Sequence, residues 1–107
     1  MKDNANMPAR ALGVALAIMR KKRGLSMGAL ARRIKVSNSN ISAWEAAISS
    51  PTWANLVAVC AGLNMKLSEF MVVVEATMKH MENEREAAKS APAGNNAKGE
   101  GLGTSGD

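Results

Sequence analysis

The stretch that most constrains the fold of this chain is residues 27–46, MGALARRIKVSNSNISAWEA. Leu30 and Ile34 are four residues apart and share one helical face. Ile41 and Trp44 are three residues apart and share a second face, beyond a short polar link. This pattern predicts two short helices joined by a turn and packed at a steep angle, which is a helix-turn-helix arrangement. Taken alone, the window also fits two adjacent core helices of any α-helical domain.

Hydroxyl residues and glycines indicate where these and the neighbouring helices begin and end. Ser26 and Ser37 are favourable N-caps, so we expect helices over residues 27–34 and from 38 to about 46. An earlier helix should start at Pro8 and stop near Gly24. After a loop at 46–50, Pro51 and Thr52 should open a fourth helix that runs to about residue 63, and a fifth should begin near residue 67.

The composition favours one small all-α domain. The chain has 107 residues, 47% of them hydrophobic, and no run alternates with period two for long enough to predict a sheet. We expect a compact five-helix domain over residues 8–81, with an extended fifth helix. Residues 1–7 should form a flexible N-terminus. Residues 82–107 should form a charged helix end and then a disordered tail, because the Gly-, Ser- and Asn-rich sequence has too little apolar surface to bury.

Charge is distributed unevenly along the chain. Residues 1–35 contain nine Lys and Arg against one acid, whereas residues 36–107 contain five against eight. A basic first third favours a polyanionic partner, most simply double-stranded DNA. The basic run Arg20 to Arg23 would suit phosphates, although charges at the end of a helix also compensate its dipole. A basic surface that serves only solubility is the alternative.

Several classes of function find no support in the sequence. The single His80 has no Cys or His near it in sequence, so we expect no metal site and no cofactor. No nucleophile–base pair or phosphate-binding glycine loop is present, so we do not expect an enzyme. A lone Cys60 in an apolar stretch is typical of a buried thiol in a reducing cytoplasm. The N-terminus lacks the apolar core of a signal peptide, and no run is long enough to span a membrane.

The fifth helix carries more apolar residues than a small four-helix core can cover. They recur at three- and four-residue steps, which predicts a homodimer interface formed by Phe70, Met71, Val74, Met78 and Met81. Methionine-rich faces adapt easily, so a second protein is the alternative occupant. Val14 and Ile18 form another apolar patch that needs a cover, so the dimer could instead form there, or only on DNA.

Over residues 10–71 the chain resembles the Cro/CI-type helix-turn-helix family (lambda-repressor-like, xenobiotic-response-element type), the DNA-binding domain of many phage and bacterial repressors. The matching residues occur in the family's order and spacing: Arg20, Gly24-Leu25-Ser26, Leu30-Ala31, Val36-Ser37, Ile41-Ser42, Trp44-Glu45, Pro51 and Leu56. The resemblance implies a cytoplasmic, sequence-specific transcriptional regulator. It also implies a repressor that binds an inverted-repeat operator as a homodimer through residues 37–46.

The resemblance assigns roles to individual residues. Arg20 and Glu45 would form a structural ion pair between the first helix and the end of the third. Base contacts would come from Ser37, Asn38, Ser39 and Ala43, among which Asn can pair in bidentate fashion with adenine. Contacts to the DNA backbone would come from Arg20, Lys21, Lys22, Arg23, Met27, Lys35, Asn40 and Ser42.

The chain departs from the family pattern in three places. Lys35 and Ala47 occupy positions where the family usually has glycine, so a left-handed backbone there would be strained. Residues 36–65 contain no Lys or Arg, so the loop that often grips phosphate in the family is uncharged here. This absence motivates the alternative function, an antitoxin-like or anti-repressor protein that binds another protein through its Met-rich fifth helix.

Overall fold

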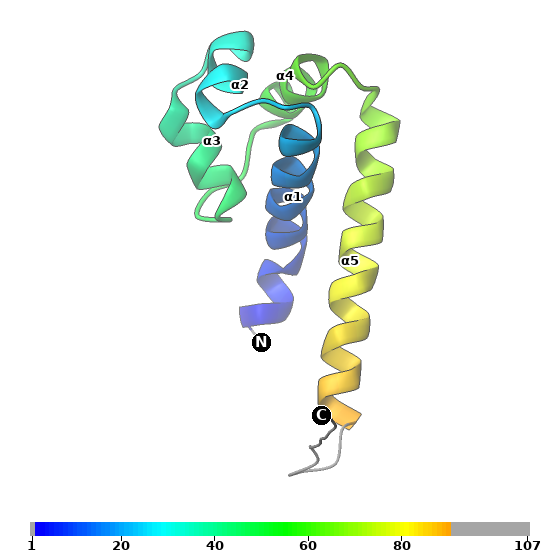
Figure 1. The fold of residues 1–107 in the computed structure, drawn as a ribbon. Coiled ribbons are helices and arrows are strands. Elements are labelled where there is room, and N and C mark those ends of the chain that lie inside the picture. Colours follow the sequence, from blue (N-terminus) through cyan, green and yellow to red (C-terminus); the bar gives the residue numbers. More distant parts are fainter. Residues whose placement is uncertain (1, 91–107) are drawn as a thin grey trace, which may run out of the picture.

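The computed structural model describes residues 2–90, which form five helices and no strand (Figure 1). Its helices are α1 (Lys2–Lys22), α2 (Met27–Ile34), α3 (Asn38–Glu45), α4 (Trp53–Gly62) and α5 (Leu67–Ser90). The all-α, five-helix prediction is therefore confirmed for this part of the chain, and the predicted disordered tail from residue 91 lies outside it. α1 packs against both α3 and α5, and α2 packs against α3 and α4.

The three short helices begin where the sequence places their caps. The side-chain oxygen of each cap accepts a hydrogen bond from the backbone N–H three residues later, at 3.0 Å for Ser26 and at 3.1 Å for Ser37 and Thr52. Each bond satisfies one of the N–H groups that the first turn of a helix leaves without a partner. These caps fix the beginnings of α2, α3 and α4 to within a residue of the prediction.

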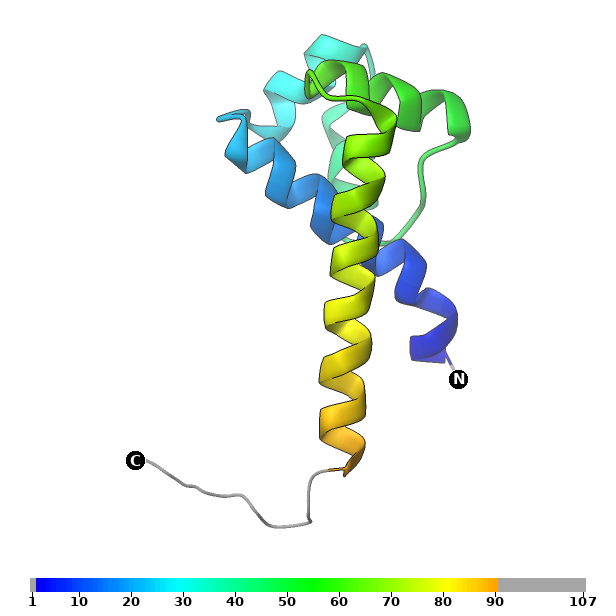
Figure 2. The same ribbon diagram turned by 90° about the vertical axis from the view of Figure 1, so that its right-hand side faces the viewer.

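The outer helices are longer than predicted. α1 begins at Lys2 and carries Pro8 inside it, and α5 continues to Ser90 (Figure 2). The expected start at Pro8 is wrong because Met7, one residue earlier, is buried. Met7 and Met81 line a common groove between α1 and α5, two helices that pack against each other.

The core lies between α1, α3 and α5 and continues to α2 and α4, and its composition corrects part of the predicted dimer interface. Leu16, Leu30 and Ile41 are fully buried in it. Phe70 is 0% exposed and Val74 is 8% exposed, so these two are core residues and cannot form the intersubunit surface assigned to them. Met71, Met78 and Met81 are half-buried and pack against the same core. α1 covers this row of α5, which accounts for the long apolar pattern within a single chain.

Within residues 2–90, no single helix is both long and apolar enough to cross a membrane. Only α4 and α5 taken together reach the length and apolar content of a membrane span, and the chain bends by 102° between them.

Candidate nucleic-acid interface

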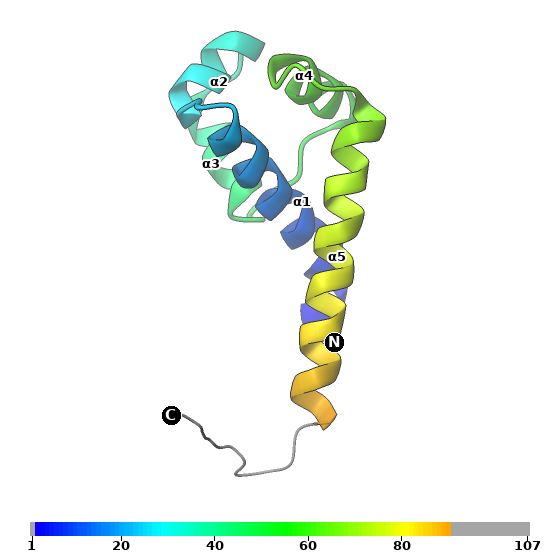
Figure 3. The same ribbon diagram turned by 45° about the vertical axis from the view of Figure 1, so that its right-hand side comes forward.

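The first turn of α3 presents a row of exposed polar side chains at the edge of the domain. Ser37, Asn38, Ser39, Asn40 and Ser42 are all exposed, and Ala43 is half-buried. On the opposite side of the helix, Ile41 and Trp44 are buried in the core. Figure 3 shows α3 on the side of α1 that faces away from α5. The structure thus gathers all the predicted base-contacting residues on one short exposed helix.

The polar side chains in this row differ in how much of their hydrogen-bonding capacity is already used. The Ser37 hydroxyl caps α3 and lies 3.1 Å from the Ser39 hydroxyl. The side-chain amides of Asn38 and Asn40 make no hydrogen bond within residues 6–89. Each of these two amides therefore keeps two N–H donors and one acceptor oxygen for a ligand. Ser37 is chiefly a structural cap.

An ion pair fixes the far end of α3 against α1. Arg20 donates through Nε to Glu45 Oε2 at 2.6 Å and through Nη2 to Oε1 at 3.0 Å, and both side chains are 8% exposed. A third donor, Arg20 Nη1, binds the carbonyl oxygen of Leu25 at 2.8 Å. The hydrogen bond to Glu45 raises the pKa of Arg20, outweighing the opposite effect of burial. This buried guanidinium uses three of its five N–H donors within the protein, so the structure gives Arg20 a structural role, and its contact to the DNA backbone stays a prediction.

Gly13 determines how closely α1 approaches α3, and the sequence analysis did not single it out. A Cβ atom at this position would lie 2.6 Å from the carbonyl oxygens of both Trp44 and Glu45. Only glycine leaves room for those two backbone groups. The position of Gly13 inside a predicted helix could have indicated this role. Glycine in the middle of a helix costs about 1 kcal/mol relative to alanine, so its presence there usually has a packing or functional reason.

The turn between α2 and α3 adopts a left-handed backbone at a non-glycine residue. Lys35 has φ 64° and ψ 45°, and its N–H binds the carbonyl oxygen of Ala31. Ala47, after α3, has φ 60°. Lys35 and Ala47 therefore adopt the left-handed backbone that glycine has at these positions in the family. For a residue with a Cβ atom this conformation costs about 1–2 kcal/mol. Lys35 is exposed in this turn, three residues before α3 begins.

Two of the basic residues are engaged at the end of α4. Arg23 donates through Nε to the Leu63 carbonyl oxygen at 2.8 Å, and Arg33 donates through Nη1 to the Gly62 carbonyl oxygen at 2.9 Å. These bonds satisfy carbonyls at the negative end of a helix dipole. Arg23 is thus a link between α1 and α4, which the sequence had suggested only as a phosphate contact. On α1, on α2 and in the turn, the exposed cations of residues 6–89 whose side chains have neither an ion pair nor a hydrogen bond are Arg10, Lys21, Lys22, Arg32 and Lys35.

Other predicted residues and sites are placed as follows. Met27, expected near the DNA backbone, begins α2 and packs half-buried against the core. Cys60 is buried, and this burial raises the pKa of its thiol. No group of three His, Cys, Asp or Glu side chains among the described residues is arranged to hold a metal ion.

Comparison with solved structures gives matches that include two structures of the clp gene regulator ClgR from Corynebacterium glutamicum. The first has a TM-score of 0.73 and 23% identity, and covers 77% of this chain and 87% of that one. The second has a TM-score of 0.63 and 25% identity, and covers 66% of this chain and 92% of that one. No curated protein matched the sequence.

A family model described as helix-turn-helix matches residues 16–70, from the middle of α1 to the first turn of α5. The matched region is more than half of the chain and contains the ion pair, the strained turn and the whole of α3. The protein therefore belongs to the Cro/CI-type helix-turn-helix family.

Proposed function

We propose that this protein is a sequence-specific DNA-binding transcriptional regulator, a repressor that binds an inverted-repeat operator as a homodimer. The observation that carries the proposal is the exposed first turn of α3, where two free Asn amides project from a helix held rigidly at its other end. Membership of the helix-turn-helix family and the likeness to a solved gene regulator support it.

Base recognition is assigned to the uncharged side chains of α3. In a helix-turn-helix, the second helix lies in the major groove and its N-terminal residues contact base edges. Asn38 can form a bidentate pair with adenine, and the hydroxyls of Ser39 and Ser42 can donate to or accept from several bases. Ala43, half-buried on the same helix, offers an apolar contact for a thymine methyl group.

Attraction to phosphate is assigned to cations outside α3, because α3 and α4 contain none. Lys35 ends α2, three residues before α3 begins, and Lys21 and Lys22 end α1. These contacts position the protein without reading sequence. With few of them, the salt dependence of binding should be shallow, since its slope scales with the number of phosphates neutralised.

A pair of α3 helices related by a two-fold axis would read half-sites about one helical turn, or roughly 10 base pairs, apart. The alternative function, in which the Met-rich face of α5 binds another protein, gains no support from the structure. Met71, Met78 and Met81 pack against the protein's own core.

The division between base and phosphate contacts is tested with four variants in fluorescence anisotropy on selected and random duplexes. Asn38→Ala should cost roughly 1–3 kcal/mol on the selected site and relax specificity at one position. Lys22→Ala should weaken binding to both duplexes and reduce the salt slope by about 1. Asn83→Ala and Lys79→Ala, exposed positions on α5, are the matched controls and should change neither. Equal losses on both duplexes from Asn38→Ala and Lys22→Ala would refute the assignment.

A further inference from the structure

α4 and the loop before it form an uncharged surface with large apolar groups exposed. Residues 46–65 contain no charged side chain. Within them Ile48 is 81% exposed, Trp53 is 67% exposed and Val57 is 43% exposed. A helix that is apolar on all sides is normally covered on all sides. The outer side of α4 has no such cover within the described chain.

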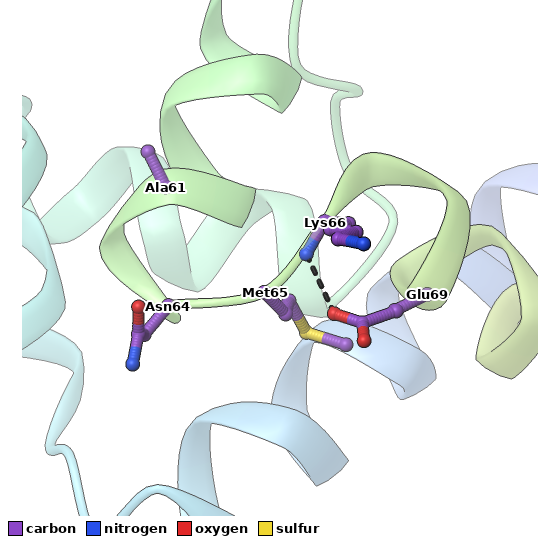
Figure 4. A pocket seen from close by; sticks show the side chains of 5 residues that line it. All are labelled: Ala61, Asn64, Met65, Lys66 and Glu69. Carbon is purple, nitrogen blue, oxygen red and sulfur yellow. Dashed lines mark hydrogen bonds between the residues drawn. The ribbon is translucent and has the colours of Figure 1, made fainter.

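This surface continues from α4 onto α5. Trp53, Val57 and Ala61 follow one another at four-residue steps and so lie along one side of α4. Ala61 and Met65 line a common hollow at the corner between the two helices, shown in Figure 4. Glu69 lies on the rim of the same hollow, and Val72, three residues further along α5, is 64% exposed. We call this surface the α4–α5 face, formed by Trp53, Val57, Ala61, Met65 and Val72.

The charges at the corner are one cation and one anion. Glu69 Oε1 accepts a hydrogen bond from the backbone N–H of Lys66 at 2.7 Å (Figure 4). Neither the Lys66 ammonium nor the Glu69 carboxylate takes part in an ion pair within residues 6–89. A two-fold axis through the corner would bring Lys66 of each copy towards Glu69 of the other. Such an interface is complementary to itself both in charge and in its apolar band.

The apolar patch on α1, formed by Val14 and Ile18, is not complementary to itself in charge. Val14 and Ile18 are flanked along the same side of α1 by Arg10 and Lys21, without an acid between them. Pairing this patch with itself would bring cations of both copies together, which opposes association. The charge pattern therefore favours the α4–α5 face for a second copy of this chain and disfavours α1.

We propose that the α4–α5 face pairs with the same face of a second copy and forms the two-fold dimer. This inference rests on the proposed function, which requires two α3 helices related by a two-fold axis. It replaces the interface predicted at Phe70 and Val74, which lie in the core. It also gives the uncharged stretch of the chain a role, because charge on this surface would be buried on association.

The test measures the association state of the full chain by sedimentation velocity over a range of concentrations. Val57→Glu is compared with Val14→Glu, because the two valines are 43% and 42% exposed on two different helices. The wild-type chain and Val14→Glu should be dimeric. Val57→Glu should weaken the dimer by roughly 100-fold or more, since it buries an unpaired carboxylate. Val72→Glu should act in the same direction, and circular dichroism and urea unfolding check that each variant folds.

The outcomes separate this inference from the proposed function. A monomeric wild-type chain, dissociation caused by Val14→Glu, or a dimer unaffected by both Val57→Glu and Val72→Glu overturns the α4–α5 face. If a DNA sequence is still selected in those cases, the proposed function stands without this interface. If the dimer depends on Val57 but no DNA sequence is selected, the interface stands and the proposed function fails.

Discussion

The buried ion pair between Arg20 and Glu45 should respond very differently to single and double substitution. Arg20→Met removes both hydrogen bonds to the Glu45 carboxylate and leaves that charge 8% exposed without a partner. Breaking a buried pair from one side costs about 3–5 kcal/mol. The Leu25 carbonyl oxygen also loses its donor, at about 1 kcal/mol. The single variant should therefore lose about 4–6 kcal/mol, a large part of the stability of a small domain.

The double variant Arg20→Met/Glu45→Leu removes the stranded charge. Apolar replacement of a buried pair is often neutral or stabilising, so the remaining loss should be close to that of the Leu25 hydrogen bond, about 1–2 kcal/mol. Equilibrium urea unfolding, followed by the fluorescence of buried Trp44, measures both values. A double variant that loses as much as Arg20→Met alone would refute the reasoning, because the loss would then come from packing and not from an uncompensated charge.

The pH dependence of the same pair follows from the raised pKa of Arg20. A group whose pKa is raised on folding contributes its full stabilisation below its unfolded pKa and loses it as the pH rises through the folded value. For an arginine both values lie above any working pH. The stability difference between wild type and Arg20→Met should therefore be the same at pH 7 and pH 9. A difference that shrinks over this range would contradict the assignment.

The remaining predictions concern strain, close packing and the thiol. Gly13→Ala should destabilise by about 1–3 kcal/mol in urea unfolding, because the new Cβ would lie 2.6 Å from the backbone oxygens of α3. Gly28→Ala, whose Cβ would meet nothing closer than 3.5 Å, is the matched control and should not destabilise. Ala47→Gly should stabilise by about 0.5–1 kcal/mol by relieving a φ of 60°, and an unchanged midpoint would argue against strain there. Because burial raises the pKa of the Cys60 thiol, native protein should resist iodoacetamide, and urea should release the reaction; rapid native labelling would contradict this.

The parts of this structure that depend on local chemistry could be predicted from the sequence. Ser26 and Ser37 define the starts of α2 and α3 through hydrogen bonds that span only three residues. Asn64 follows α4 with φ 57°, and asparagine is one of the few residue types that readily adopts this left-handed conformation after a helix. The Arg20–Glu45 pair is long-range, yet it could be anticipated because the resemblance to a known family supplied the partner.

The errors all involve contacts between helices that are distant in sequence. Phe70 and Val74 were assigned to a dimer interface because the apolar pattern of α5 alone does not reveal that α1 packs over these residues. The link from Arg23 to the carbonyl oxygen of Leu63 was missed because the two residues are forty positions apart, whereas the phosphate contact assigned to Arg23 stays a prediction. Gly13 required the position of α3 before its role could be recognised.

The most direct test of the central claim is selection of bound duplexes from a random or genomic DNA pool, at roughly 50–100 mM salt so that the few phosphate contacts persist. We predict enrichment of one inverted repeat whose half-sites are about 10 base pairs apart. We also predict that Asn38→Ala changes the preferred base at one position in each half-site. Recovery of DNA without any enriched sequence would contradict it, and would leave a basic surface that binds DNA without reading it.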